Sequence, residues 1–452
     1  MSQELIQKGL RFFIPINDRT KKMNYYSLNK KSPKVSFRDA VIKGLAPDKG
    51  LYFPEGISPL PKAFFDNIGN LSHSEIAFEA IKQFVSSDIP EDTLKNIINE
   101  TLSFDFPIVE LNKNISTLEL FHGPTMAFKD VGARFMALCL GYFNQSNTNE
   151  VTVLVATSGD TGAAVANGFL GVKGVKVVIL YPSGKVSDIQ EKQLTTLGQN
   201  INALEVNGTF DDCQAMVKTA FLDENLTNKM QLTSANSINI ARWLPQLFYF
   251  MFAYKKLHNE CKDIVFSVPS GNFGNVCAGI MAQQLGLPIK HFIASNNENN
   301  VVTEYLMTQL YNPKPSVQTI SNAMDVGDPS NFIRIQEIYE NKFKTLKDNV
   351  SSFSFSDNET KAAILEIYTN HNYIADPHGA VGYLGCKAYL EKNPNAYCVF
   401  LETAHPTKFL DVVEDIIKTK QALPQQIQSV MGRIKLATTI STYEDFKEYL
   451  LE

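Results

Sequence analysis

The chain has 452 residues, with 42 Lys and Arg against 47 Asp and Glu and a formal net charge of −5. This balance excludes a protein that binds nucleic acid through overall basic charge, and the length suits about three domains of roughly 150 residues. The cysteines form no C-x-x-C pair and the amino terminus lacks a signal-peptide core, which predicts a cytoplasmic protein without disulfides or a metal site. The longest strongly apolar stretch, 244–254, is shorter than the roughly 20 residues of a membrane-spanning helix.

The amino-terminal quarter of the chain is predicted to be mostly helical. Residues 1–22 end in a basic, turn-like run and are interpreted as an extension, although a genuine helix is equally compatible with them. Across 36–110, apolar residues recur at three- and four-residue spacing, for example in 74–85 and 92–104. Residues 23–112 are therefore expected to form a leading helical domain.

Beyond this region, strand-like apolar runs alternate with helical segments, which is typical of βαβ units and a parallel sheet. The strand-like runs lie at 151–157, 175–181, 201–206, 263–269, 290–295 and 397–403. The helical segments lie at 187–198, 210–222 and 238–258. A loop-rich stretch at 311–332 is long enough to predict a binding segment or lid rather than a passive connection.

Two glycine-containing turns each follow a predicted strand and open a helix. They are TSGDTG at 157–162 and SGNFGN at 270–275. In this position, backbone N–H groups and the positive end of the helix dipole converge on one point that suits an anion. Neither turn matches a dinucleotide or P-loop pattern. Taken alone, each turn is equally compatible with an ordinary strand-to-helix connection that uses glycine for backbone reasons.

Lys129 is the lysine whose neighbours point to chemistry. It lies between Phe128 and Asp130, at a predicted helix start that follows a Gly-Pro turn. A lysine among apolar neighbours can have its pKa lowered, and its amine then becomes nucleophilic enough to hold a carbonyl as a Schiff base. Most lysines are solvated surface charges, so spacing alone does not assign Lys129 a catalytic role.

The order of several segments resembles the fold-type II family of pyridoxal-phosphate enzymes and, within it, the threonine synthases. The resemblance rests on residues 50–55, 119–135, 156–169, 234–246, 268–279, 324–334, 376–383 and 402–409. It implies an α/β fold with two parallel-sheet domains, similar to the β subunit of tryptophan synthase, plus a mostly helical N-terminal domain. The expected parts are an extension at 1–22, the helical domain at 23–112, a large cofactor-binding domain at 113–145 and 240–452, and a small domain at 146–239.

The resemblance also implies a pyridoxal 5'-phosphate cofactor and assigns residues to it. Lys129 matches the Schiff-base lysine, and Thr403 matches the residue whose hydroxyl meets the pyridine nitrogen. The cradle of the cofactor phosphate is matched by Ser270, Gly271, Asn272, Phe273, Gly274 and Asn275. A doubly charged phosphate needs several N–H donors without a bulky side chain in the way, which agrees with the glycines and the helix start.

The turn at 157–162 matches the loop that receives the α-carboxylate of the substrate in this family. Ser158, Thr161 and the backbone of Gly162 are its candidate donors. Asp160 takes the place beside the cofactor O3′ where many fold-type II enzymes carry Asn. The resemblance therefore implies that the first turn binds substrate and the second binds cofactor.

Other polar residues are compatible with either a functional or a structural role. Arg242 and Lys185 are candidate partners for a substrate phosphate, because a dianion attracts guanidinium and ammonium groups, but a surface or capping role is at least as compatible. His122, His378 and His405 lie in matched segments and could move protons, and we favour hydrogen-bonded structural imidazoles.

The sequence also departs from the family pattern. Gly379 stands where Thr is usual, Thr407 stands where Ala is frequent, and Gly327 with Asp328 occupies a commonly less acidic position. None of these changes touches the lysine or the phosphate turn, so the implied activity is retained.

The resemblance implies conversion of O-phospho-L-homoserine and water to L-threonine and phosphate, the last step of threonine biosynthesis. Lys129 would carry the cofactor and act as base and acid at Cα. The expected partner is this small-molecule substrate, without nucleic acid or membrane, for a monomer or homodimer. Four alternatives stay open: a serine or threonine dehydratase, an O-phospho-lyase that adds no water, a non-catalytic cofactor-binding homologue, and a flavodoxin-like nucleotide binder.

Overall fold

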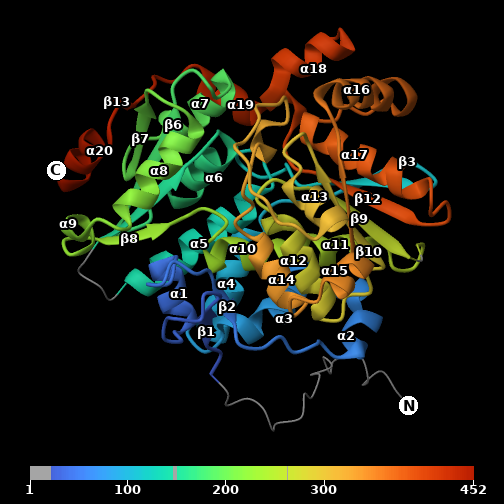
Figure 1. Ribbon diagram of the computed structural model, residues 1–452, viewed down its shortest axis with the longest axis horizontal. Helices are drawn as coiled ribbons and strands as arrows, with labels where there is room; N and C mark the ends of the chain where they lie inside the picture. Colours follow the sequence, from blue (N-terminus) through green and yellow to red (C-terminus); the bar gives the residue numbers. More distant parts are fainter. Residues whose placement is uncertain (1–21, 146–149, 262) are drawn as a thin grey trace, which may run out of the picture.

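The computed structural model describes residues 22–145, 150–261 and 263–452. These residues form a helical amino-terminal part and two sheets that are each flanked by helices (Figure 1). The extension predicted at 1–22 lies outside the described residues except for its last residue. In the described ranges, no helix combines the length and apolar character needed to cross a membrane.

The amino-terminal part is mostly helical, as predicted, and adds a small antiparallel sheet. Its elements are β1 (Tyr25–Ser27), α1 (Phe37–Lys43), β2 (Tyr52–Pro54), α2 (Lys62–Asp66), η2 (Ile68–Asn70), α3 (His73–Val85) and α4 (Glu91–Thr101). Ser72 and Glu75 form a capping box that satisfies free N–H groups at the start of α3. The apolar face of α3 is fully buried around Ile76 and Phe84, so this part shares its core with the rest of the molecule.

The larger sheet has six strands in the order β11-β10-β9-β12-β4-β3. These strands are β3 (Ile108–Asn112), β4 (Ile115–Glu119), β9 (Ile264–Pro269), β10 (His291–Asn296), β11 (Val350–Ser354) and β12 (Tyr397–Glu402). All neighbours run parallel except β3 and β4. Alternate residues face opposite sides, so Phe266 belongs to the main core while Val265 and Phe400 join a second core with Ala380 and Tyr383.

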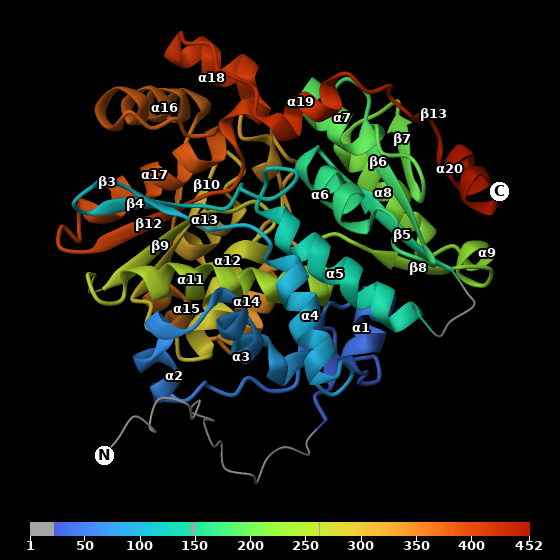
Figure 2. The ribbon, with the colours of Figure 1, turned by 180° about the vertical axis from the view of Figure 1, so that it is seen from behind.

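Helices connect and cover this sheet on both faces (Figures 1 and 2). They are α10 (Ile240–Trp243), η3 (Leu244–Gln246), α11 (Leu247–Leu257), α12 (Gly274–Gln284), α13 (Val301–Thr308), η4 (Asn322–Met324), α14 (Phe332–Ile338), α15 (Phe343–Asn349), α16 (Asp357–His371), α17 (Pro377–Leu390), η5 (Pro406–Phe409) and α18 (Leu410–Ile417). The single helix predicted at 238–258 is divided, because Pro245 has no N–H to donate within a helix.

The smaller sheet has five parallel strands in the order β13-β7-β6-β5-β8. They are β5 (Val151–Ala156), β6 (Val175–Pro182), β7 (Ile201–Val206), β8 (Gln231–Ser234) and β13 (Thr438–Ile440). The accompanying helices are α5 (Lys129–Asn144), α6 (Asp160–Phe169), α7 (Asp188–Thr195), α8 (Phe210–Ala220), α9 (Glu224–Thr227), α19 (Gln425–Met431) and α20 (Tyr443–Leu451).

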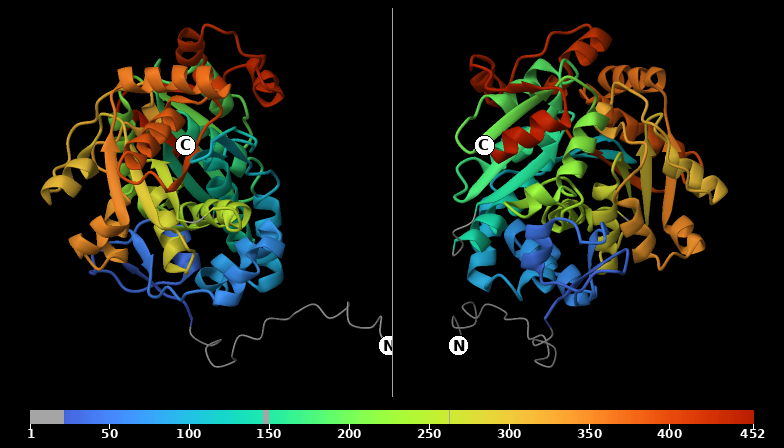
Figure 3. Two further views of the ribbon diagram at one scale, coloured as in Figure 1. Left: turned by 90° about the vertical axis from the view of Figure 1, so that its right-hand side faces the viewer. Right: turned by 60° about the vertical axis from the view of Figure 1, so that its left-hand side comes forward.

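The carboxyl-terminal segment corrects the predicted domain boundaries. We expected all of 240–452 in the large domain, yet β13 pairs with β7 and α20 packs its buried Phe446 into the core of the smaller sheet. In Figure 3 this red helix lies beside the green strands. The prediction missed β13 because its three residues, Thr-Thr-Ile, form no apolar run. The large sheet also begins before residue 113, since β3 starts at Ile108 and pairs with β4.

Candidate active site

A cavity of about 960 Å³ lies between the two sheets. Its walls come from the start of α5, the turns after β5 and β9, the segment 234–242, the loop 322–330 and the residue that follows β12. In open parallel sheets, the space beyond the carboxyl ends of the strands is the usual ligand site. The fold therefore brings the two glycine turns of the sequence to one cavity.

Most of the predicted site residues line this cavity. Those that do are Lys129, Ser158, Thr161, Arg242, Gly271, Asn272, Phe273, Gly274, Asn275 and Thr403. Asp160, Gly162 and Ser270 are buried just behind the wall. Lys185 is exposed in the turn after β6 and is not among the lining residues, so its predicted contact with a substrate phosphate receives no support.

Lys129 is the first residue of α5, and main-chain contacts hold it beside Thr403. The N–H of Phe128 donates to the carbonyl of Thr403 at 2.8 Å, and Ala127 forms a β-bridge with Ala404. The two segments are far apart in sequence, yet their backbones are paired. The position of Lys129 relative to Thr403 is therefore fixed by the backbone rather than by flexible side chains.

The surroundings of Lys129 favour an uncharged amine. Burial lowers the pKa of Lys129 from its ordinary value, and the nearby Lys408 and Arg242 lower it further, while Asp160 opposes the shift. The Lys129 Nζ also lies 5.6 Å from the ring centroid of Phe128. A larger share of unprotonated amine makes Lys129 a better nucleophile and base.

Asp160 and Lys408 form a buried ion pair behind Lys129. Lys408 Nζ lies 2.6 Å from Asp160 Oδ1, and both side chains are almost completely enclosed. Gln190 Nε2 donates to the same oxygen at 2.9 Å, and Lys408 also donates to the carbonyl of Thr125 at 2.9 Å. Although burial opposes it, the charges of Lys408 and Lys129 hold the pKa of Asp160 well below its usual range. Sequence reasoning missed Lys408, because only the fold brings η5 to the start of α6.

The turn at 270–275 presents unsatisfied N–H groups to the cavity. Phe273, the N-cap residue of α12, has φ of 60° and contributes no side-chain hydrogen bond. The N–H groups of Gly274 and Asn275 begin the helix and have no acceptor within it. A Cβ at Gly271 would lie 2.7 Å from Met324 Cα, so only glycine allows this close approach. Ser270 and Asn275 side chains instead donate to Val268 and Pro269 carbonyls.

The turn at 157–162 satisfies part of its own backbone. Thr157 Oγ1 accepts the N–H groups of Gly159 at 2.9 Å and Gly162 at 2.8 Å. The N–H of Gly162, predicted as a substrate donor, is therefore already occupied. Gly159 has φ of 134°, and a Cβ there would lie 2.5 Å from Gln190 Cδ. Ser158 and Thr161 remain on the cavity wall.

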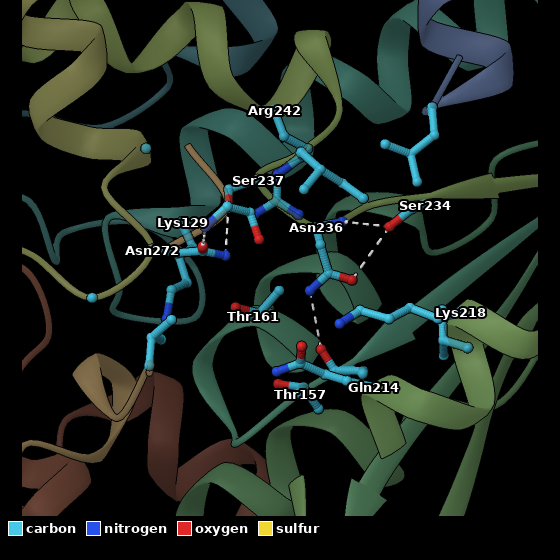
Figure 4. A pocket seen from close by; sticks show the side chains of 18 of the residues that line it. Lys129, Thr157, Thr161, Gln214, Lys218, Ser234, Asn236, Ser237, Arg242 and Asn272 are labelled. Carbon is cyan, nitrogen blue, oxygen red and sulfur yellow. Dashed lines mark hydrogen bonds between the residues drawn. The ribbon is translucent and has the colours of Figure 1, made fainter. Parts of the chain in front are cut away.

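Arg242 approaches the cavity from α10 together with polar residues that sequence reasoning did not single out. Arg242 is 4% exposed, and burial lowers the pKa of its guanidinium to about 10. Its Nη1 donates to the carbonyl of Ala235, while its buried Nε has no partner among the described residues. Asn272 Nδ2 donates to Ser237 Oγ at 3.3 Å. In Figure 4, Lys129 and Asn272 lie on one side of the cavity and Lys218 on the other.

The cavity carries an excess of positive side chains. Apart from Lys129, its charged lining consists of Lys43, Lys49, Lys218 and Arg242 against Asp325 and Asp328. The chain as a whole has a formal net charge of −5, so this local excess does not follow from composition. A low-dielectric cleft lined by one sign of charge concentrates ligands of the opposite sign. The arrangement suits a small anionic ligand.

The three histidines have hydrogen-bond or ring partners that agree with structural roles. His378 Nδ1 lies 2.5 Å from Asp376 Oδ1, and its Nε2 accepts the N–H of Ala323 at 3.2 Å. Burial lowers the pKa of His405 to about 4, and its ring caps Thr407. His122 Nε2 lies 2.7 Å from a Glu119 carboxyl oxygen. His378 alone of the three lines the cavity in the described part of the chain.

Comparisons with known proteins agree with this geometry. Models of three families match: pyridoxal-phosphate dependent enzyme over 109–403, threonine synthase N terminus over 24–102, and threonine synthase C-terminal over 379–449. Threonine synthase of Escherichia coli is 42% identical over 406 residues, which cover 90% of this chain and 94% of that protein. The chain belongs to the threonine synthase family.

Solved structures of the family share the whole fold. Threonine synthase from Escherichia coli has a TM-score of 0.89 at 39% identity and covers 95% of this chain and 99% of its own. Pyridoxal-phosphate-bound threonine synthase from Brucella melitensis has a TM-score of 0.88 at 32% identity. The match covers 95% of this chain and 98% of that chain. The predicted fold-type II α/β class, the enzyme class, the threonine synthase function and the pyridoxal-phosphate cofactor are confirmed.

The residues present fit this cofactor. The start of α12 has no side-chain cap, and Gly271 in the turn before it has no side chain to block a ligand, which suits a phosphate group. A lysine with a lowered pKa suits an aldehyde, and a hydroxyl at the end of a strand suits a ring nitrogen. All three features line one cavity, as a molecule of this size requires.

Proposed function

We propose that this cavity converts O-phospho-L-homoserine and water to L-threonine and phosphate. One observation carries the proposal: Lys129, the open amide groups at the start of α12 and Thr403 line the same positively charged cavity. The first turn and Arg242 lie on the remaining wall, where they can hold the two anionic ends of the substrate. A phosphate on the substrate adds a second dianion to that of the cofactor, which suits the excess of positive charge on the cavity wall.

In this proposal, the residues at 271–275 and Thr403 orient the cofactor while Lys129 moves protons. Bound pyridoxal phosphate supplies a conjugated ring that accepts the electron pair left at Cα. The lowered pKa of Lys129 keeps a share of its amine unprotonated, so Nζ can hold the cofactor aldehyde and, once released, take the Cα proton and return it. Thr403 offers a neutral hydroxyl to the pyridine nitrogen, which does not force a proton onto the ring.

The proposed substrate contacts divide between the two anionic groups. The Ser158 and Thr161 hydroxyls, at the start of α6, would receive the α-carboxylate. Arg242 would receive the phosphate, because its Nε is buried without a partner and its charge suits a dianion. Asp160 would not contact the substrate. It is buried beside the cavity, where its charge interacts with Lys129 and Lys408. Lys185 is left out of the proposed site.

The loop at 311–332 would exclude water during proton transfer at Cα. Residues of this segment, including Ala323, Met324 and Val326, line the cavity. Asn297 Nδ2 donates to Asp325 Oδ1 at 2.8 Å, and Thr319 Oγ1 donates to the same oxygen at 2.7 Å. These bonds anchor the loop over the site, and ordered closure protects reactive species from untimely water.

The proposed site is complete within one chain, which is compatible with a monomer or a homodimer. The six cysteines are free, and this supports the predicted cytoplasmic, reducing setting. Sedimentation of the purified protein measures the oligomeric state directly.

Product analysis tests the proposed activity. Purified protein loaded with pyridoxal phosphate is mixed with O-phospho-L-homoserine, and threonine, 2-oxobutanoate and phosphate are quantified. We expect threonine and phosphate in equal amounts. Phosphate with 2-oxobutanoate would instead indicate an O-phospho-lyase, and 2-oxobutanoate from unphosphorylated amino acids would indicate a dehydratase.

A matched pair of lysine variants tests the role of Lys129. Lys129→Ala is expected to lose turnover by about 10³-fold or more, together with the visible absorption of the lysine-bound cofactor. Lys62→Ala removes a lysine whose side chain is 91% exposed and should leave both unchanged. A yellow, active Lys129→Ala variant would remove Lys129 from the proposed mechanism.

A further inference from the structure

Glu402 is a buried carboxyl group that the reaction does not use. It is the last residue of β12, directly before Thr403, and it is 0% exposed. Its Oε1 accepts the N–H of Asp376 at 2.5 Å, while its Oε2 is buried without a hydrogen-bond partner among the described residues. Burial raises the pKa of Glu402 well above its ordinary value, and the charge of Asp376 adds to the shift.

The missing side chain of Gly379 creates the space for this carboxyl group. A Cβ at Gly379 would lie 1.7 Å from Glu402 Oε2 and 2.5 Å from Glu402 Cδ. Both distances are impossible contacts for a carbon atom. Gly379 lies in the first turn of α17, so Glu402 fills the gap between the end of β12 and the start of this helix. The two residues are complementary in shape, and a larger residue at 379 would require the buried Glu402 carboxyl group to move.

Asp376 links Glu402 to the cavity wall. Asp376 Oδ1 accepts the N–H of His378 at 2.7 Å and lies 2.5 Å from His378 Nδ1, while Oδ2 accepts the N–H of Ala404 at 3.3 Å. His378 Nε2 in turn accepts the N–H of Ala323 at 3.2 Å. This pattern requires the His378 tautomer that carries its proton on Nδ1.

The far end of this chain of contacts touches the turn at 270–275. Ala323 and Met324 belong to η4, and a Cβ at Gly271 would meet Met324 Cα at 2.7 Å and the carbonyl oxygen of Ala323 at 3.0 Å. The position of η4 therefore determines how much room the phosphate turn has. Hydrogen bonds run from β12 to η4 without passing through solvent.

We propose that Glu402 and Gly379 are a matched pair that positions η4 against the phosphate turn, through Asp376 and His378. Glu402 is thus a positioning residue for the cofactor cavity, and this inference rests on the function proposed for that cavity. It acts as an uncharged acceptor. A negative charge at this place would face the carboxylates of Asp376 and Glu119, whereas a neutral group can accept the Asp376 N–H without repulsion.

Five variants, including Glu402→Ala alone, separate shape from charge. Glu402→Gln keeps the size and the acceptor and should hold kcat/KM within about twofold of the parent. Gly379→Ala places a methyl group on Glu402 and should lower kcat/KM by about tenfold or more. Gly379→Ala with Glu402→Ala should recover most of this loss, whereas Gly379→Ala with Glu402→Gln should not. Gly56→Ala, where a Cβ would meet no atom within 4 Å, is the control.

Hydrogen exchange provides a readout that does not depend on turnover. In the full-length protein without substrate, peptides that span Ala323 should exchange faster in Gly379→Ala and in Glu402→Ala than in the parent, and at the parent rate in Glu402→Gln. Peptides from α3 should be unchanged and report intact folding. If the chain makes a different product, these exchange results still test the pair.

Two results would overturn the inference. The first is that Glu402→Gln impairs activity and Ala323 exchange as much as Glu402→Ala, because the carboxyl group would then act through its charge. The second is that Glu402→Ala fails to rescue Gly379→Ala in both readouts, because the two residues would then not act as a pair.

Discussion

The turns at 157–162 and 270–275 hold the same place in their sheets, after a buried parallel strand and before a helix, but they use their amide groups differently. In the first turn, Thr157 Oγ1 accepts two of the N–H groups. In the second, Phe273 is the N-cap residue of α12 and contributes no side-chain hydrogen bond. The first turn is therefore shaped by its own side chains, and the second leaves its donors for an external anion.

The two turns also differ in what holds them in place. Asp160 of the first turn is tied to Lys408 by a buried ion pair, which joins α6 to η5. Gly271 of the second turn is held by close contact with Met324 rather than by charge. A glycine turn between strand and helix therefore does not by itself define a ligand. Its ligand depends on which amide groups the surroundings leave free. Three variants test this difference, and a fourth tests the large sheet away from both turns.

The largest expected effect comes from the ion pair of the first turn. Asp160→Asn leaves the Lys408 charge buried without its partner, and we expect a loss of about 3 kcal/mol in the free energy of unfolding. Urea denaturation measures it. Asp415→Asn breaks a pair whose side chains are 75% and 80% exposed and should cost less than about 0.5 kcal/mol. Equal losses in both variants would contradict a special role for the buried pair.

The next effect concerns close approach in the second turn. Gly271→Ala would press a methyl group on Met324 Cα, so the turn must open and its donors lose alignment. We expect cofactor affinity to fall about 10- to 100-fold, measured by fluorescence titration of the apoprotein. Gly56→Ala is the matched control, since its Cβ would meet nothing within 4 Å. Unchanged affinity in Gly271→Ala would show that this turn does not cradle the phosphate.

A smaller effect is expected from the side chain that shapes the first turn. Thr157→Val keeps the volume but removes the acceptor for Gly159 and Gly162. We expect KM for the substrate to rise about tenfold with little change in cofactor affinity, since two hydrogen bonds are lost at about 1 kcal/mol each. Thr219→Val, on the exposed face of α8, should change neither. A loss of cofactor affinity instead would remove the distinction between the turns.

The smallest effect tests the large sheet away from both turns. Burial lowers the pKa of His291 to about 4, below the ordinary value of 6.5. Between these values the unfolded chain binds a proton that the folded chain does not, so stability falls as pH decreases from 6.5 toward 4. We expect His291→Gln to reduce the loss between pH 7 and pH 5 by on the order of 1 kcal/mol, measured by urea denaturation. An unchanged loss would show that His291 titrates normally in the fold.

The buried parallel strands could be predicted from the sequence, because their apolar runs have no polar interruption. Residues 151–157 and 201–206 correspond to β5 and β7 within one residue. The strand β11, with the sequence VSSFS, could not be predicted, because it has no apolar run and its half-buried serines hydrogen-bond to residues of β10. Propensity and periodicity describe one segment at a time, whereas β11 is defined by its pairing with β10.

Much of the candidate site could be predicted in the same way, because its residues lie in compact motifs. Lys129 and the turn at 270–275 were predicted together and line one cavity. Lys408 and Glu402 could not be assigned, because their environment depends on elements that the chain order does not bring together. Lys185 shows the opposite failure: its positive charge near a motif predicts substrate binding, but the turn after β6 places it at the surface.

Borohydride reduction tests the central claim most directly. Protein loaded with pyridoxal phosphate is reduced, which fixes the cofactor to the amine that holds it, and is then digested and analysed by mass spectrometry. We predict that the label lies on Lys129. Lys408 is a second buried amine close to Asp160 and serves as the internal comparison. A label on Lys408, or on any lysine outside the cavity, in protein that makes threonine would contradict the account.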